Sequence, residues 1–132
     1  MPGFGIPKVS GTFQTVDADL VNKQFRAVKF TSDERVVDFC TAATDKVVGI
    51  LNNVPYAAAG KDAEVIMFGE AKAKLAGDVV AGNHLVSDAN GDLVAVTPLN
   101  TGTLNWSVGI ALEDGADDDI KRVFVNPCWV LV

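Results

Sequence analysis

The order of apolar and polar residues predicts short β-strands along most of the chain. The segments QFRAVKF (24–30) and RVVDFCT (35–41) are rich in β-branched and aromatic residues, and the turn-prone residues 31–34 lie between them. We expect these two segments to pair as a hairpin. Further strands are predicted at 47–51, 63–75, 83–88, 92–96, 106–112 and 121–125, separated by Gly, Asn, Asp and Pro residues. Short strands at such regular spacing indicate an all-β fold, either a small antiparallel β-barrel or a sandwich.

Helical patterns are weak by comparison. Val16, Leu20 and Val21 have a spacing that allows a short helix within 16–25, and the segment TAATD (41–45) could form a single turn. Neither segment changes the fold class.

An internal similarity links two parts of the chain. VVGILNN (47–53), a linker of small residues and AEVIMFG (63–69) resemble SVGIALEDG (107–115), the segment ADDD (116–119) and IKRVFVN (120–126). Both parts place Val-Gly-Ile before a loop and follow the loop with a strand that contains Val and Phe. Two copies are too few for a solenoid, so this similarity predicts a pseudo-symmetric β-sheet.

The first sixteen residues differ in character from the rest. Glycine and proline interrupt the apolar residues there, which disfavours both helices and strand ladders. We expect residues 1–16 to form an extended N-terminal arm and residues 17–132 to form one β-rich domain. Fully stretched, such an arm would span ~50 Å, enough to lie on a neighbouring molecule. The apolar contact residues expected on the arm are Phe4, Ile6, Pro7 and Phe13. A frayed terminus is the alternative.

Charge and composition exclude several classes of partner. The chain has 11 basic and 17 acidic residues, a net charge of −6, which repels a phosphate backbone. We therefore expect no direct nucleic-acid partner. No run of eighteen apolar residues is present, and the first residues lack the pattern of a signal peptide, so we expect no membrane segment and no export.

The two cysteines do not form a recognisable motif. Cys40 and Cys128 lie too far apart for a CxxC site and are too few for a disulfide scaffold. We expect free, mostly buried thiols, since free cysteine behaves as a small apolar residue. A disulfide and a redox pair are the alternatives.

The segment Asp88-Ala89-Asn90-Gly91-Asp92 could be read as a metal loop or as a turn. It supplies the first three ligand positions of an EF-hand, but Leu93 occupies the glycine position and Leu99 the glutamate position. The turn reading fits every residue, because Asp and Asn favour turns and glycine permits positive φ. We expect a hairpin that pairs Ser87 with Leu93 and Val86 with Val94, with Val86, Val94 and Val96 on one face and His84 at its end.

Residues that could support catalysis do not form a motif. His84 is the only histidine, and the chain has no nucleophile elbow and no CxxC site, although Cys40 and His84 could meet in the fold. AAAGKD (57–62) lacks the glycine and the Ser or Thr of a phosphate-binding loop. EDGADDD (113–119) is expected to be a solvated loop that protects a sheet edge. We therefore expect no enzyme activity, no cofactor and no metal.

A set of segments in a particular order resembles a known family. They are VKF (28–30), VVGIL (47–51), AEVIMFGEAKAKLAG (63–77), VVAGNHLVSDANGDLVAV (79–96), VGIALED (108–114) and KRVFVNP (121–127). This order is similar to that of the capsid decoration, or cement, proteins of tailed bacteriophages, a family sometimes labelled as RecA-like or RadA-like phage recombinases. The recombinase label does not suit the chain, since it has neither a P-loop nor the pattern of a parallel α/β core.

The resemblance implies a fold and a role. The fold would be a compact antiparallel β-barrel or β-tulip-like sandwich on the outer surface of the phage head, reached from the host cytoplasm during assembly. The protein would stabilise the shell by bridging major capsid proteins, commonly as a homotrimer. Another virion part, such as a fibre base or tail accessory, and a small enzyme or ligand-binding barrel are the alternatives.

The C-terminal segment NPCWVLV (126–132) lies outside the best of this resemblance. It could be a final core strand or a trimer contact, and we favour the contact. The contact residues expected there are Trp129 and Leu131.

Overall fold

The computed structural model describes residues 9–96 and 104–131, and β-strands dominate this part of the chain. The strands are β1 (Val9–Thr15), β2 (Ala27–Phe30), β3 (Val36–Phe39), β4 (Val47–Leu51), β5 (Asp62–Lys74), β6 (His84–Ser87), β7 (Leu93–Ala95), β8 (Leu104–Ala111) and β9 (Ile120–Leu131). A short 3-10 helix, η1 (Ala18–Asn22), follows β1, and residues 41–45 form a turn in which the Asp45 N–H donates to the Ala42 carbonyl. The all-β prediction is confirmed.

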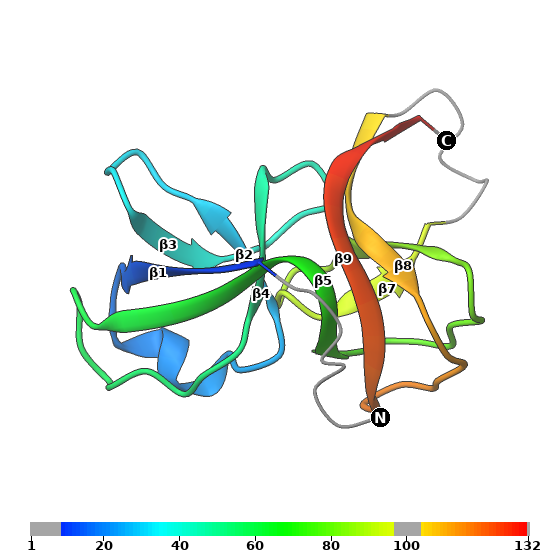
Figure 1. Cartoon of the computed structure of the whole chain (residues 1–132), viewed down its shortest axis with the longest axis horizontal. Helices are drawn as coiled ribbons and strands as arrows, with labels where there is room; N and C mark the ends of the chain where they lie inside the picture. Colours follow the sequence, from blue (N-terminus) through cyan, green and yellow to red (C-terminus); the bar gives the residue numbers. More distant parts are fainter. Residues whose placement is uncertain (1–8, 97–103, 132) are drawn as a thin grey trace.

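Five strands close into a barrel. β1 pairs in parallel with β3, β3 pairs with β2, β2 with β4, β4 with β5, and β5 returns to β1, all antiparallel apart from the first pair. The predicted hairpin of 24–30 with 35–41 is confirmed as β2–β3. The strands β6 to β9 lie beside this ring, to the right of it in Figure 1, and the second part of β5 pairs with β9.

The strands outside the ring repeat the pairing of the ring itself. The pairings β2–β3, β2–β4 and β4–β5 recur as β6–β7, β6–β8 and β8–β9. The register recurs as well, since Ile50 opposite Ile66 corresponds to Ile110 opposite Phe124. The parallel pairing that closes the ring, Thr15 with Val37, corresponds to a single parallel bridge between Leu75 and Leu93.

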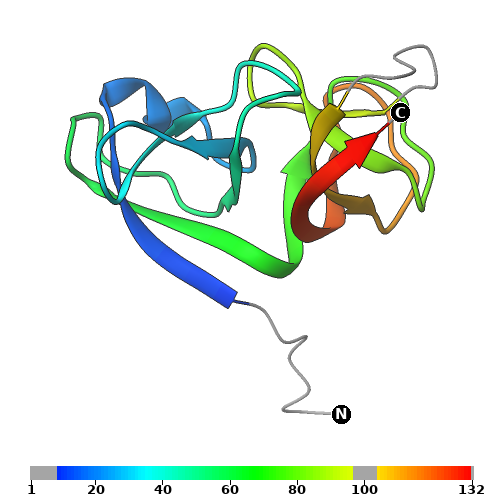
Figure 2. The same ribbon diagram turned by 90° about the horizontal axis from the view of Figure 1, so that it is seen from above.

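The described chain therefore contains two barrel-like units in tandem, which we call the first unit (9–68) and the second unit (69–96 and 104–131). They share β5, whose first part is the last strand of the first unit and whose second part is the first strand of the second. Figure 2 shows β5 running under the first unit and turning up into the second. The internal similarity found in the sequence is thus confirmed as a structural repeat.

The glycine of each Val-Gly-Ile motif explains why that motif recurs. A Cβ atom on Gly49 would lie 2.0 Å from the backbone oxygen of Ile66, and a Cβ atom on Gly109 would lie 1.9 Å from that of Phe124. In both units the last two strands approach so closely that no side chain fits between them.

Two clusters of buried side chains form the core, and one of them joins the units. One lies inside the first unit and comprises Phe13, Leu20, Val28, Val37, Val48, Leu51, Ala63 and Val65. The other, which we call the shared core, takes residues from both units, among them Ala27, Cys40, Ile50 and Ile66 from the first and Leu75, Leu85, Leu93, Val108 and Val123 from the second. Burial of this apolar surface favours a fixed arrangement of the two units.

The prediction of an arm over 1–16 is wrong for the part that the structure describes. Val9–Thr15 is strand β1, paired with β5 and β3, and Phe13 is buried inside the first unit with only 8% of its surface exposed. Phe13 and Thr15 both point inward, two residues apart, as in any strand with one buried face. The other arm residues, Phe4, Ile6 and Pro7, lie outside the described residues.

Candidate functional site

The loop from Asp88 to Asp92 is a turn. The Asp88 carboxylate accepts the N–H groups of Asn90 at 2.8 Å and Asp92 at 3.0 Å, and Gly91 has a φ of 82°. The predicted pairs Ser87–Leu93 and Val86–Val94 are both present. The face opposite to Val86 and Val94, which carries Leu85 and Leu93, is the one in the shared core.

Asp92 also forms an ion pair across the boundary between the units. Its carboxylate lies 2.9 Å from Nε of Arg26, and the two side chains are only 12% and 17% exposed. Burial raises the pKa of Asp92, and the positive charge of Arg26 opposes that rise. The Ala27 N–H donates to the Gly91 carbonyl close by, at 2.9 Å. This pair therefore joins the units and does not form an open site.

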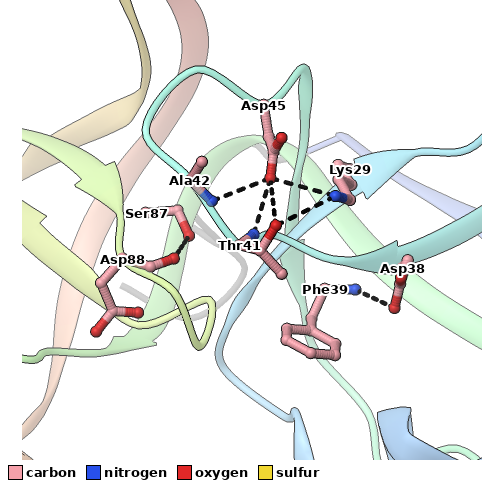
Figure 3. Close-up of polar contacts among 8 residues, drawn as sticks. All are labelled: Lys29, Asp38, Phe39, Thr41, Ala42, Asp45, Ser87 and Asp88. Atoms are coloured by element: carbon pink, nitrogen blue, oxygen red, sulfur yellow. Dashed lines mark hydrogen bonds and ion pairs between the residues drawn. The ribbon is translucent and has the colours of Figure 1, made fainter.

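A second polar cluster closes the turn after β3 (Figure 3). The Asp45 carboxylate accepts the N–H groups of Thr41 at 2.8 Å and Ala42 at 3.1 Å, and it lies 3.4 Å from the Lys29 ammonium. Burial alone would raise the pKa of Asp45, but these donors and the Lys29 charge lower it. The carboxylate is held by its own turn and is not directed at a ligand.

The two residues considered as a nucleophile and its base lie in different environments. Cys40 is fully buried in the shared core, and burial raises the pKa of its thiol to about 12. It is therefore a protonated core residue at neutral pH. The His84 side chain is at the surface, where Nδ1 lies 3.4 Å from the Ser107 hydroxyl. Both thiols are free, as predicted, but only Cys40 is buried, and Cys128 is exposed.

Three carboxylates of the acidic loop 113–119 accept backbone N–H groups, one of them from the turn before β6. Glu113 accepts the N–H of Arg122 at 3.0 Å, Asp114 that of Ala81 at 2.9 Å, and Asp119 that of Ala116 at 2.9 Å. Within 9–96 and 104–131, no group of three His, Cys, Asp or Glu side chains is placed to hold a metal ion. The same part of the chain has no helix with the length and hydrophobicity needed to cross a membrane.

Apolar surface is what remains as a candidate for function, and its first part is at the end of the β8–β9 ribbon. β9 continues beyond Val125, the last residue that pairs with β5, and pairs with β8 as far as Leu131 opposite Leu104. The rings of Trp106 and Trp129 meet edge to face, 4.2 Å between centroids. We call Leu104, Trp106 and Trp129 the aromatic ledge.

The structure shows that the C-terminal segment is a strand, and the trimer contact stays a prediction. Trp106 packs against the shared core, while Trp129 covers Trp106 and remains 46% exposed. The segment is therefore a strand that leaves half of a large aromatic side chain free for contact. Leu104 adds to this surface, since it is 48% exposed.

A second apolar surface follows the seam between the units. The rings of Phe68 and Phe124 meet edge to face with centroids 5.2 Å apart, and Val9, the partner of Phe68, is 52% exposed. Ile110 lies opposite Phe124 on β8. We call Val9, Phe68, Ile110 and Phe124 the seam strip. Beside it is a pocket of about 200 Å³ lined by His84, Gly109, Ile110, Phe124, Asn126 and Cys128.

The third apolar surface is the loop between β4 and β5. Tyr56 is 83% exposed and Val54 57% exposed, and both line a shallow hollow of about 380 Å³. Residues 52–60 contain no charged side chain. Exposed aromatic and aliphatic groups of this kind are typical of protein contacts, whereas catalysis needs convergent polar groups.

The sequence analysis predicted only some of the residues on these apolar surfaces. It indicated Trp129 and Leu131, and the structure places Trp129 on the aromatic ledge and Leu131 at the end of the same strand. It missed Phe68, Ile110 and Phe124, each of which lies in a segment predicted as a strand. The signal that could have found them is the position of Phe68 and Phe124 on the outward face of strands whose inward face is already apolar.

Comparison with known proteins gives a fold relationship. No family model matches the chain, and no curated protein matches it. Among solved structures, the fold is similar to that of the N base of the head fibre protein gp8.5 of bacteriophage phi29, with a TM-score of 0.56 and 13% sequence identity. The match covers 91% of this chain and 95% of that chain. At this identity the likeness concerns the fold alone, and it includes nearly the whole of both compared chains.

Proposed function

We propose that this chain is a structural protein of a bacteriophage virion that attaches to the phage head and acts by binding, without catalysis. The observation that carries the proposal is the fold likeness to a head fibre base over nearly the full length of both chains. The base of a head appendage is therefore our first choice within this class. A decoration protein is the second candidate, favoured by the resemblance of the ordered sequence segments to cement proteins.

The surface chemistry suits either role. The aromatic ledge, the seam strip and the β4–β5 loop present exposed apolar groups. Contacts of moderate size become persistent when several act together, because each bound contact raises the effective concentration of the next. The stiff sheet between these surfaces would hold them at fixed separation. We propose the major capsid protein as the partner.

Imaging of labelled virions tests the proposal. Antibody against the purified protein, carrying gold particles, should label heads of the phage that encodes it. A few labelled points on each head support an appendage base, and a dense regular array supports decoration. Label on the tail, or on no part of the particle, contradicts the proposal.

We further propose that the aromatic ledge links copies of this chain into a trimer. Trp129 is the exposed member of the Trp106–Trp129 pair, so its replacement by alanine should remove contact area without opening the shared core. Sedimentation velocity of Trp129→Ala should show a smaller species than the parent protein. Val54→Ser, on the β4–β5 loop, is the matched control. An unchanged trimer in Trp129→Ala contradicts this assignment of the contact.

A further inference from the structure

One edge of β9 is paired over only half of its length. The first part of β9, 120–125, lies between β8 and β5, but beyond Val125 the strand pairs with β8 alone. Within residues 9–96 and 104–131, no strand covers the other side of this second part. We call the side of 127–131 that faces away from β8 the open edge. Unpaired backbone groups of this kind are the template for a further strand.

The ladder with β8 fixes which residues face the open edge. The Trp106 N–H donates to the Ala43 carbonyl at 2.8 Å, so it points away from its partner Trp129. Opposite residues in an antiparallel ladder alternate between pairs that exchange hydrogen bonds and pairs that do not. Trp106 and Trp129 are a pair of the second kind, so the N–H and C=O of Trp129 face the open edge. Those of Leu131 do the same, and Pro127 adds a carbonyl.

The first unit shows what the equivalent edge of β5 takes up. The register that aligns Val65 with Val123 places Ala71 of β5 where Trp129 lies in β9. Ala71 is paired with Val123, in the antiparallel ladder between the second part of β5 and the first part of β9. Each unit thus ends in a strand that continues beyond it. The continuation of β5 is covered by an antiparallel strand, and that of β9 is not.

We propose that the open edge of β9 binds an extended segment of another protein as an added antiparallel strand. Residues 104–111 and 123–131 contain no charged side chain, so the edge lacks the charges that keep exposed strands from pairing. The net charge of −6 favours a neutral or basic segment. Its residue opposite Trp129 should be apolar, because cross-strand neighbours are in contact and Trp129 is 46% exposed. The inference concerns backbone pairing and does not depend on a role in a virion.

The molecule's own sequence supplies a probe. The peptide IKRVFV, residues 120–125, covers the equivalent part of β5, carries two positive charges and contains no tryptophan. The chain has two tryptophans, and both belong to the aromatic ledge beside the open edge. Titrating the full chain with the end-capped peptide should therefore change the tryptophan emission. Hydrogen exchange of the Trp129 amide, followed by NMR, should slow about tenfold or more at saturation.

Two methylated peptides distinguish strand pairing from other modes of binding. The Leu112 N–H donates to the Arg122 carbonyl, so Arg122 faces β8 and its neighbours Lys121 and Val123 face β5. N-methyl groups at Lys121 and Val123 of the peptide block the side that would meet the open edge, and they should abolish binding. N-methyl groups at Arg122 and Phe124 leave that side intact, and this peptide should bind. The two peptides have the same side chains and charge.

A matched pair of substitutions tests the edge in the protein itself. Leu131→Pro removes an N–H that faces the open edge and should weaken peptide binding about fivefold, the effect of one lost hydrogen bond. Proline is tolerated where the N–H faces away from the neighbouring strand. Leu131→Ala keeps the N–H and should change the affinity by no more than about twofold.

Three results would overturn the proposal. Equal binding of the two methylated peptides would mean that the contact does not use backbone pairing. Unchanged emission and unchanged exchange at ~1 mM unmodified peptide would mean that the edge does not accept a strand. Slow exchange of the Trp129 amide without peptide would mean that the edge is already covered. The cover would be a second copy if dilution removes the protection, and the same chain if it does not.

Discussion

The two units have the same strand pairing but differ in the residues that occupy their strained positions. At three equivalent positions the backbone has positive φ in both units, and the pairs are Phe25 (68°) with Gly82 (94°), Arg35 (59°) with Gly91 (82°), and Asp118 (67°) with Gly60 (72°). In every pair one unit uses glycine and the other does not. Positive φ costs roughly 1–2 kcal/mol for residues other than glycine. The pairing of the strands therefore imposes this backbone conformation even where the local sequence disfavours it.

The loops between the last two strands of each unit differ far more. In the first unit this loop is uncharged over 52–60 and exposes Tyr56, whereas in the second it is the acidic segment 113–119. The acidic loop keeps its surface solvated, and the uncharged loop leaves apolar groups for contact. The repeated strands thus serve as a common scaffold, while the loops give the two ends different surfaces.

The last strands of the two units also diverge at one equivalent position. The register that aligns Val65 with Val123 also aligns Gly69 with Pro127. Gly69 has a φ of 107°, which glycine adopts readily, and there β5 leaves the first unit. Proline has a φ near −65° and cannot adopt that conformation. β9 instead stays with β8 and forms the aromatic ledge.

The largest expected effect tests whether the units are truly equivalent. Gly49→Ala and Gly109→Ala should each destabilise the protein by more than about 3 kcal/mol, because the new Cβ would meet a backbone oxygen at 2.0 or 1.9 Å. Urea denaturation measures both. Gly77→Ala is the control, since nothing lies within 4 Å of its Cβ position. Tolerance of alanine at one position but not the other would break the equivalence.

A smaller effect is expected at the junction of the units. Asp92→Ala leaves Arg26 largely buried without its partner and should reduce the free energy of unfolding by about 3 kcal/mol. Arg122→Ala breaks an ion pair with Glu70 in which Arg122 is 65% exposed, and should cost no more than about 0.5 kcal/mol. Similar losses in the two variants would mean that the Arg26–Asp92 pair does not join the units.

A third prediction concerns the turn in the first unit that Asp45 holds, and it depends on pH. The pKa of Asp45 is lower in the folded protein than in the unfolded chain, where it is about 3.9. The ionised carboxylate therefore stabilises the folded state fully above the unfolded pKa, and this contribution is lost as the pH falls through the folded pKa. Asp45→Asn should cost about 1 kcal/mol at pH 7, with the difference from the parent protein shrinking toward pH 3. Denaturation at both pH values measures it. A loss that is the same at both would exclude the carboxylate charge as the cause.

The smallest effect lies at the strained positions themselves. Asp118 has a φ of 67°, and its side chain is 79% exposed with a weak 3.8 Å contact to Lys74. Asp118→Gly should therefore stabilise the protein slightly, by roughly 0.5 kcal/mol, since relief of positive φ exceeds the entropy cost of glycine. Gly60→Ala, at the equivalent position, should destabilise by about 1 kcal/mol. Thermal unfolding resolves both, and opposite signs are the expected result.

The sequence predicted the strands β2 to β8 well because each carries β-prone residues bounded by turn residues. It failed for β1, where Gly11 and polar residues separate Val9 from Phe13 and weaken the strand signal. The partners of β1 on β5 are about fifty residues away in the chain, and local pattern does not report such pairing. It also ended β9 too early, since Pro127 in the middle of a strand is a signal for its end.

The candidate surfaces were harder to predict than the strands. Alternation shows that a strand has two faces, but it does not say which is covered when both carry apolar residues, as at Phe68 and Phe124. Only the packing of the two units decides that these rings face outward. The turn at Asp88, by contrast, was predictable because its hydrogen bonds are local.

The sharing of β5 between the units has a mechanical consequence. Tension applied to one unit passes along a continuous backbone into the other, so the ladder of β5 with β4 and β1 and its ladder with β9 are loaded in series and in shear. A load of this kind must break many hydrogen bonds at once rather than peel them one by one. Ladders loaded in series carry the same force, so the ladder of β5 with the weaker pairing should yield first and the other unit should stay folded until it does.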